Sequence, residues 1–189
     1  MGGFYTNYTF RGVSQEAVAK ALAGREALIS KEQHGCVVVF DKLSDAQDQA
    51  QIAGLASSLS KSLNCAVLAV LDHDDDILWY QLYEAGKLSD EYDSTPNYWG
   101  TRGPSPLPPS GGNAARLCAA FQAGDPAVVE TILRRSSIAK NNYVFAMDRH
   151  KDLVRALGLP EFALGGAYGG IVRGYYPQGL SKQDLVSPA

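Results

Sequence analysis

The amino-acid sequence predicts an α+β protein built on an antiparallel sheet, and three observations support this class. Segments with strand-like and helix-like patterns follow one another as strand, helix, strand, strand, helix and strand between residues 5 and 71. The last of these strands, residues 65–71, is a continuous apolar run, which is typical of a strand covered on both faces. Helical patterns then return in the second half of the chain. The order of the first six elements is that of a ferredoxin-like βαββαβ core.

Composition places the chain among globular proteins and limits its partners. It has 189 residues, of which 46% are apolar and 20% are charged, and both values are close to the globular average. The formal charge of −3 argues against a generally basic nucleic-acid binder. No apolar run approaches the roughly 20 residues that a membrane-spanning helix needs. We therefore expect neither a nucleic-acid partner nor a membrane partner.

The cysteines and the N-terminus point to the cytoplasm. Cys36, Cys65 and Cys118 lie far apart beside apolar residues, and no two of them have the spacing of a zinc site or a redox pair. The first residues lack the basic start and the apolar stretch of a signal peptide. The sequence therefore predicts a cytoplasmic protein with reduced thiols.

Capping and turn residues delimit the first four elements. The first strand is predicted at residues 5–10. Ser14 then begins a helix and Gly24 ends it, because serine accepts hydrogen bonds from the first turn and glycine tolerates a left-handed end. Two strands follow at residues 27–29 and 36–40, separated by a short polar turn.

The second helix has the clearest pattern, since its apolar residues recur at helical spacing on one face. Ser44 and Gln47 fit a capping box at its start, and Asn64 fits a left-handed end. After the buried strand, residues 77–83 and 88–93 predict an antiparallel hairpin that extends the sheet. Both faces of the first hairpin strand are mostly apolar, so we expect C-terminal helices packed back on the sheet.

The second half of the chain is predicted to be mainly helical. Proline and glycine exclude regular structure from residues 100–112. Asn113, Asp125 and Asp148 are the predicted N-caps of three helices, because a short polar side chain accepts hydrogen bonds from the first turn. Residues 143–147 are predicted to form a short strand before the last of these helices.

These segments define the expected domain organisation. Residues 1–99 form an α+β sheet domain with an acidic hairpin, residues 100–112 form a loop rich in proline and glycine, and residues 113–189 form a mainly helical part. We expect the sheet domain and the helical part to pack as one globule, because the second apolar face of the hairpin needs a cover.

Acidic residues concentrate in the predicted hairpin. Residues 72–93 contain eight acidic residues and one lysine, a local charge of −7, so the rest of the chain carries +4. Like charges so close together favour a positive partner, and aromatic side chains beside them are typical of protein interfaces. The leading hypothesis is a non-catalytic regulatory or adaptor protein, immunity-like or inhibitor-like in type, that binds a basic protein surface. Its predicted partner-binding residues are Asp74, Asp75, Asp76, Asp90, Glu91, Asp93, Tyr98 and Trp99.

A divalent cation is the alternative ligand of the same turn. Aspartates at alternate positions match the first acidic positions of a calcium loop. The match ends at Ile77, which stands where the sharp turn requires glycine, and at Tyr83, which stands where the closing glutamate belongs. A different Ca²⁺ or Mg²⁺ site remains a hypothesis, with the ligands Asp72, Asp74, Asp76 and Glu84. No cofactor is required, and a solvated turn that blunts edge pairing is the simplest alternative.

No sequence motif supports catalysis. The chain has no nucleophile elbow, no phosphate-binding loop of the Walker type, no dinucleotide fingerprint and no metalloprotease motif. The three histidines, His34, His73 and His150, are interpreted as bystanders. We therefore predict no catalytic residue, and a metal-dependent hydrolase that uses the acidic turn is the third hypothesis.

Three segments resemble those of a family of uncharacterised bacterial proteins of similar length. They are Tyr-Thr-Asn-Tyr-Thr at 5–9, Leu-Asp-His-Asp-Asp-Asp at 71–76 with Leu-Trp-Tyr-Gln-Leu-Tyr-Glu at 78–84, and Arg-His at 149–150 through Leu-Gly-Leu-Pro at 157–160. The resemblance covers most of the chain. It implies a bacterial cytosolic protein, and it implies no activity, cofactor or site.

Overall fold

The structure is a computed structural model, and it describes residues 3–100, 107–135 and 143–188. Its strands are β1 (Phe4–Arg11), β2 (Ala27–Ser30), β3 (Cys36–Asp41), β4 (Ala66–His73), β5 (Ile77–Glu84), β6 (Lys87–Asp93), β7 (Ser110–Gly111) and β8 (Leu185–Val186). Its helices are α1 (Gln15–Ala21), α2 (Gln49–Leu63), α3 (Ala114–Phe121), α4 (Pro126–Arg134), α5 (Ala146–Ala156) and α6 (Tyr168–Val172), with 3-10 turns η1 (Leu43–Ala46), η2 (Glu161–Ala163) and η3 (Lys182–Asp184).

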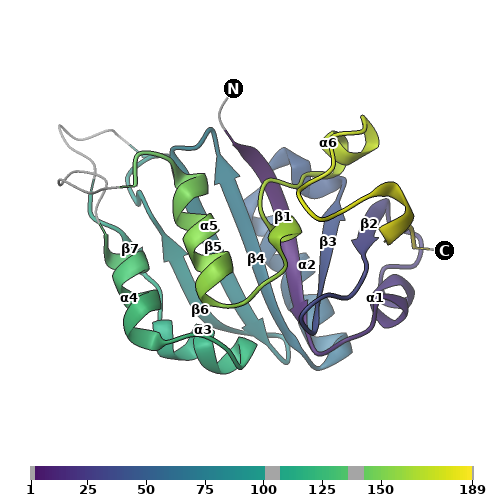
Figure 1. Ribbon diagram of the computed structural model, residues 1–189, viewed down its shortest axis with the longest axis horizontal. Coiled ribbons are helices and arrows are strands. Elements are labelled where there is room, and N and C mark those ends of the chain that lie inside the picture. Colours follow the sequence, from purple (N-terminus) through teal and green to yellow (C-terminus); the bar gives the residue numbers. More distant parts are fainter. Residues whose placement is uncertain (1–2, 101–106, 136–142, 189) are drawn as a thin grey trace.

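Within these residues, eight strands form one antiparallel sheet in the order β7-β6-β5-β4-β1-β3-β2-β8. Helices cover both faces of this sheet (Figure 1). The predicted α+β class is therefore confirmed. No described helix is both long enough and apolar enough to cross a membrane.

The sheet is larger than the predicted ferredoxin-like core, and its strand order as a whole differs from that of a four-stranded sheet of this kind. β5, β6 and β7 extend it beyond β4, and β8 extends it beyond β2. β8 comes from the C-terminal end of the chain and pairs with β2, with Ile29 opposite Val186. The tail of the chain thus completes one edge of the sheet, which local sequence patterns did not indicate.

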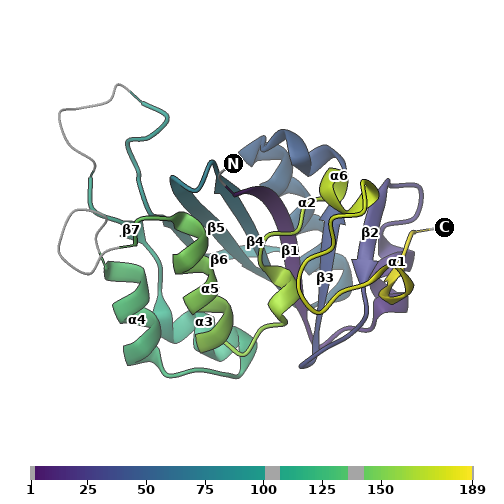
Figure 2. The ribbon, with the colours of Figure 1, turned by 45° about the horizontal axis from the view of Figure 1, so that its top comes forward.

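Alternate residues of the sheet build two apolar cores, one on each face. In β4, Val67 and Ala69 pack in the core that contains α1 and α2, whereas Leu68 and Val70 pack in the core that contains α3, α4 and α5 (Figure 2). Both faces of β4 are therefore covered, which is why residues 65–71 are apolar without interruption. The C-terminal helices pack on the second face of the sheet, as that pattern requires.

The start of α2 differs from the predicted capping box, which is wrong. Ser44 lies in η1, where its N–H and its hydroxyl donate to Asp41 Oδ2 at 2.9 and 2.6 Å. Asp48 caps α2 instead, because its Oδ1 accepts hydrogen bonds from two N–H groups of the first turn. Gln47 lies between them with a φ of 56°, so the chain changes direction there. The predicted left-handed end at Asn64 is confirmed by its φ of 48°.

The start of α5 also differs from the prediction. The strand predicted at residues 143–147 and the predicted cap Asp148 are both wrong, because Ala146 is already the first helical residue. A tertiary hydrogen bond explains why the helix begins at this residue. The N–H of Ala146 donates to the carbonyl oxygen of Asp75, at 2.7 Å, in the turn that joins β4 and β5. A distant residue thus satisfies one of the free donors at the start of this helix.

The loop predicted at residues 100–112 contains one short strand. β7 pairs with the end of β6, with Gly111 opposite Tyr92. Residues 101–106, where part of the proline-rich stretch falls, lie outside the described residues. The end of this loop therefore pairs with the edge of the sheet.

Candidate functional site

A tight turn of aspartates joins β4 to β5. Its central residues Asp74 and Asp75 have φ values of 54° and 62°, and the N–H of Asp76 donates to the carbonyl oxygen of His73 at 2.9 Å. Left-handed backbone at both central positions is the type I′ turn, which matches the twist of paired strands. Aspartate tolerates this conformation better than most residues. Asp74 and Asp75 of the acidic cluster therefore have a structural role, because they favour this turn.

Exposed acidic and aromatic side chains meet at this end of the sheet. Asp74 and Asp76 are exposed, and Trp99 is exposed over 55% of its surface. Tyr98 connects the two groups. Its hydroxyl donates to Asp76 Oδ2 at 3.2 Å, and its ring meets that of Trp99 edge-on with the centroids 5.1 Å apart. The structure thus brings together four of the predicted partner-binding residues.

The ring of His73 lies at the centre of this cluster. Its centroid is 4.5 Å from that of Trp99 and 5.8 Å from that of Tyr98. Phe4 faces His73 across the ladder of β1 and β4, with the ring centroids 5.2 Å apart, and is 47% exposed. Sequence reasoning missed Phe4. The register of two paired strands, which places Phe4 opposite His73, is the signal that could have found it.

Gln47 fixes the orientation of the His73 ring. The side-chain N–H group of Gln47 donates to the carbonyl oxygens of Asp72, at 2.8 Å, and Tyr5, at 3.3 Å. Its amide oxygen lies 2.6 Å from His73 Nδ1. Because an amide oxygen can only accept, Nδ1 must carry the proton. His73 is therefore a link between η1 and the turn rather than a bystander.

A distant segment adds one more aromatic side chain to this end of the sheet. Phe145 is exposed, and it directly precedes Ala146, whose N–H donates to the carbonyl oxygen of Asp75. Sequence reasoning missed this neighbour as well, because 70 positions separate Phe145 from Asp75. We refer to the exposed side chains of Phe4, Asp74, Asp76, Trp99 and Phe145 as the turn-end surface.

The exposed carboxylates of the turn-end surface are not neutralised by lysine or arginine in the part of the chain that the structure describes. Asp74 Oδ2 lies 3.7 Å from His73 Nε2, and Asp76 Oδ2 accepts the hydrogen bond from Tyr98. The ion pairs of lysine and arginine among these residues lie elsewhere. The turn-end surface therefore combines two negative charges with exposed aromatic rings.

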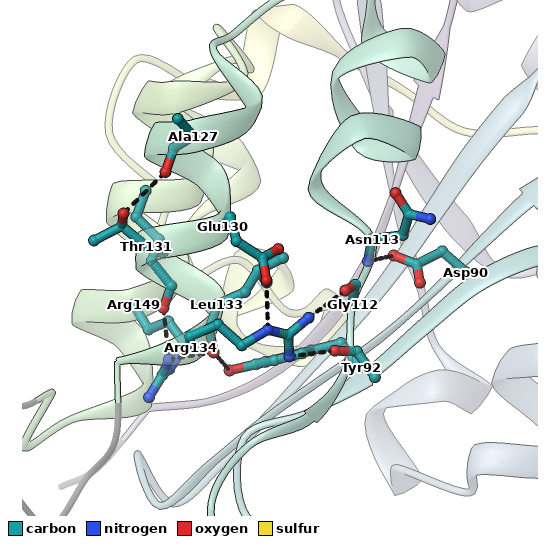
Figure 3. Close-up of polar contacts among 12 residues, drawn as sticks. Asp90, Tyr92, Gly112, Asn113, Ala127, Glu130, Thr131, Leu133, Arg134 and Arg149 are labelled. Carbon is teal, nitrogen blue, oxygen red and sulfur yellow. Dashed lines mark hydrogen bonds and ion pairs between the residues drawn. The ribbon is translucent and has the colours of Figure 1, made fainter.

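The other acidic residues predicted to bind the partner are placed differently. Asp90 lies on β6, and its Oδ2 accepts a hydrogen bond from the N–H of Asn113 at 2.9 Å (Figure 3). The same oxygen accepts a hydrogen bond from the Tyr80 hydroxyl, also at 2.9 Å. Glu91 is exposed opposite the middle of β5. Asp93 is half-buried, and burial raises its pKa. The hairpin therefore does not present its acids as one continuous patch.

The four residues predicted as metal ligands are not brought together. Asp76 directly precedes β5 and Glu84 ends it, so about 25 Å of strand separates them at about 3.4 Å per residue. Glu84 pairs with Arg116 of α3. Among the described residues, no group of three or more histidine, cysteine, aspartate or glutamate side chains could hold a metal ion. The four predicted ligands therefore do not converge on one position in the described part of the chain.

The buried Asp72 and the half-buried Asp75 form an acidic pair at the turn. Asp72 Oδ1 accepts the N–H of Asp75 at 3.2 Å, while Asp72 Oδ2 and Asp75 Oδ1 are buried with no described partner. Burial raises the pKa of Asp72 to about 8, and the charge of Asp75 adds to the rise. A side-chain interaction with Tyr5 opposes this rise in the pKa of Asp72. The hydroxyl of Tyr5 lies 2.6 Å from His150 Nδ1. Burial therefore favours the neutral form of Asp72, which lies beneath the turn-end surface rather than on it.

Comparisons with known proteins give no information about the function of this site. Comparisons with protein-family models, with curated proteins and with solved structures each found no match. The chemistry of the turn-end surface itself, which offers carboxylates and aromatic rings to a partner, is therefore the basis for a functional proposal.

Proposed function

We propose that this protein is a non-catalytic regulatory or adaptor protein that docks on a basic protein surface through the turn-end surface. One observation carries the proposal. Two exposed carboxylates stand beside three exposed aromatic side chains at one end of the sheet, and no lysine or arginine neutralises them among the described residues. An immunity-like or inhibitor-like protein is one form that such a binding function takes.

The combination of side chains favours a protein partner over a small ion. Aromatic residues are enriched at the centres of protein interfaces, where they bury a large area at a low cost in conformational entropy. Carboxylates beside them steer a positive partner and suppress wrong partners. Trp99 supplies the largest exposed ring, and Asp74 and Asp76 supply the charge. This division of roles predicts that the carboxylates set specificity and that Trp99 sets much of the affinity.

Hydrogen bonds and ring contacts order part of the turn-end surface in the absence of a partner. The type I′ turn fixes the backbone of Asp74, and the Tyr98 hydroxyl holds the Asp76 carboxylate at 3.2 Å. The ring of His73, which is hydrogen-bonded to Gln47, meets the ring of Trp99 edge-on with the centroids 4.5 Å apart. Ordering side chains on binding costs free energy, so a surface that is already ordered binds more tightly for the same contacts.

The test removes the two charges while keeping the turn. Because asparagine also tolerates left-handed backbone, the variant D74N/D76N retains the type I′ geometry. The partner is captured on the immobilised protein, purified, and titrated by calorimetry against the wild type and the variant. We expect D74N/D76N to weaken binding about tenfold, because two interface charges contribute together about 1.4 kcal/mol. The wild-type affinity should fall towards that of the variant in high salt.

The matched control removes two exposed carboxylates elsewhere. E16Q/E32Q changes the net charge by the same amount on α1 and in the connection between β2 and β3, away from the turn, and should bind like the wild type. W99A should weaken binding by about 2 kcal/mol if the ring is central to the interface. A partner that binds D74N/D76N as tightly as the wild type at low salt would rule out the proposed surface.

We also propose that residues 4–73 form a ferredoxin-like βαββαβ unit within the larger sheet. Three features support this assignment. The strands of this region are neighbours in the order β4-β1-β3-β2, all their pairings are antiparallel, and α1 and α2 contribute to the same core. In this view β5 to β7 and β8 are extensions, and the turn-end surface lies where the unit meets its first extension.

A further inference from the structure

A groove between α4 and α5 has a chemistry complementary to that of the turn-end surface. Its apolar lining includes Val128, Ile132 and Ala156, and Val128 is exposed over half of its surface. Arg135 and Arg155 are exposed and line the same groove. The groove therefore offers an apolar floor to an aromatic ring and two guanidinium groups to carboxylates.

The positive charge of this groove is not neutralised within the described ranges. Neither Arg135 nor Arg155 forms an ion pair there. Arg135 lies over the ring of Tyr143, with its guanidinium carbon 5.0 Å from the ring centroid. Asp152 also lines the groove, and its Oδ2 accepts a hydrogen bond from the Tyr143 hydroxyl at 2.6 Å. Two arginines and one engaged aspartate leave the groove with a net positive charge.

The turn-end surface and the groove are related through α5. Ala146, the first residue of α5, contacts the turn, whereas Arg155 and Ala156 line the groove from the last turn of the helix. Figure 1 shows α5 lying across the sheet. A helix of 11 residues is about 16 Å long at 1.5 Å per residue. Arg135 lies near the N-terminal end of α5, beside Tyr143, whereas Arg155 and Ala156 lie at the far end of the helix from the turn. The turn of one copy therefore cannot reach the far end of its own groove. A second copy can.

We infer that the basic surface recognised by the turn-end surface is the α4–α5 groove of a second copy of this chain. The carboxylates of one copy then pair with Arg135 and Arg155 of the next, and the exposed aromatic rings lie on the apolar floor. This inference rests on the proposed function, because it assigns the partner of the same surface. Two different surfaces meet in such a contact, so each added copy leaves one free turn-end surface and one free groove.

Two variants test this head-to-tail contact. The turn variant D74N/D76N keeps an intact groove, and the groove variant R135Q/R155Q keeps an intact turn-end surface. The wild type should self-associate at about 50 mM salt, with a sedimentation coefficient that rises with protein concentration and stops rising in about 0.5 M salt. Each variant alone should associate at least tenfold more weakly. An equimolar mixture should form a 1:1 dimer and nothing larger, because only one productive contact remains.

The matched control K20Q/K87Q removes two exposed positive charges outside the groove and should associate like the wild type. A wild type that stays monomeric at about 50 mM salt and about 1 mM protein, or a mixture that does not dimerise, overturns the inference. The proposed function survives that result if D74N/D76N still weakens the binding of another captured protein about tenfold. Both fail if D74N/D76N changes neither self-association nor binding of any captured protein.

Discussion

At the scale of single residues, Arg149 shows how this fold buries a charge without a carboxylate. Its exposure is 2%, and it forms no ion pair with an acid among the described residues. The guanidinium donates to the carbonyl oxygens of Ile132 and Arg135, at 2.7 and 2.6 Å, at the C-terminal end of α4. Figure 3 shows the Arg149 side chain beside α4. The ring of Tyr143 lies 4.6 Å from it. The free carbonyls of a helix end carry partial negative charge, which compensates the cation.

We expect R149M to destabilise the protein by about 3 kcal/mol, because it leaves several buried carbonyl oxygens without a donor. Chemical denaturation at pH 7 measures this change in the free energy of unfolding. R155M, which removes an exposed arginine from the same helix, is the control and should stay within about 0.5 kcal/mol of the wild type. Equal stabilities of R149M and R155M would show that the buried guanidinium is dispensable.

At the scale of elements, two glycines differ in the space around them: one could be replaced by alanine without a collision, and the other could not. Gly54 lies in the middle of α2 on an exposed face, and a Cβ there would meet no atom within 4 Å. Gly111 lies in β7 with a φ of 68°, and a Cβ there would collide with the carbonyl oxygen of Glu91 on β6. The first glycine weakens its helix, whereas the second permits the close approach of β7 to the sheet.

We expect G54A to stabilise the protein by about 0.5 to 1 kcal/mol, because alanine restricts the unfolded chain and suits the helix interior. Thermal unfolding followed by circular dichroism should show a higher midpoint. A lower midpoint would mean that α2 is packed against something at Gly54.

We expect G111A to destabilise the protein by about 2 kcal/mol, since it adds left-handed strain to a backbone collision. The N–H of Gly112, which donates to the carbonyl oxygen of Glu91 at 2.6 Å, should then exchange faster with solvent. Unchanged stability together with unchanged exchange would contradict a close docking of β7.

At the scale of the whole molecule, two buried groups give folding stability an unusual dependence on pH. Burial raises the pKa of Asp72 from 3.8 to about 8, so its contribution is complete below pH 3.8 and is lost as the pH rises to 8. Burial lowers the pKa of His150 from 6.5 to about 3, so its contribution is complete above pH 6.5 and is lost as the pH falls to 3. The pH dependences of the two contributions have opposite sign, so they cancel between pH 3.8 and 6.5. Above pH 6.5 only the contribution of Asp72 still changes with pH.

We therefore expect the free energy of unfolding to fall by about 2 kcal/mol between pH 6.5 and 8, at about 1.4 kcal/mol per pH unit. D72N should abolish this loss. H150Q, which keeps an acceptor for the Tyr5 hydroxyl but does not titrate, should extend the loss down to about pH 4. Urea unfolding at half-unit pH intervals measures all three profiles. A D72N profile that falls as steeply as the wild type would refute the role of Asp72.

The sequence by itself determined most of the elements, because their signals act within a few residues. Asn113 and Asp125 cap α3 and α4 as predicted, and Asn64 ends α2, since each of these side chains or backbones satisfies hydrogen bonds of the adjacent turn. The unbroken apolar run at residues 65–71 indicated a strand with two covered faces, because burial on both sides leaves no polar position. The aspartate turn was also found, as a cluster of acids.

The tertiary structure decided what those elements bring together. Pairing of β1 with β4 places Phe4 beside the turn, and the hydrogen bond from Ala146 to Asp75 sets the start of α5 and brings Phe145 there. The glycine-rich α6 has no local signal, and Asp45 holds its first N–H groups from 123 positions away. Contacts of this kind depend on which strands become neighbours, and the free energy that selects the neighbours comes from burying whole faces of the sheet rather than from any local pattern.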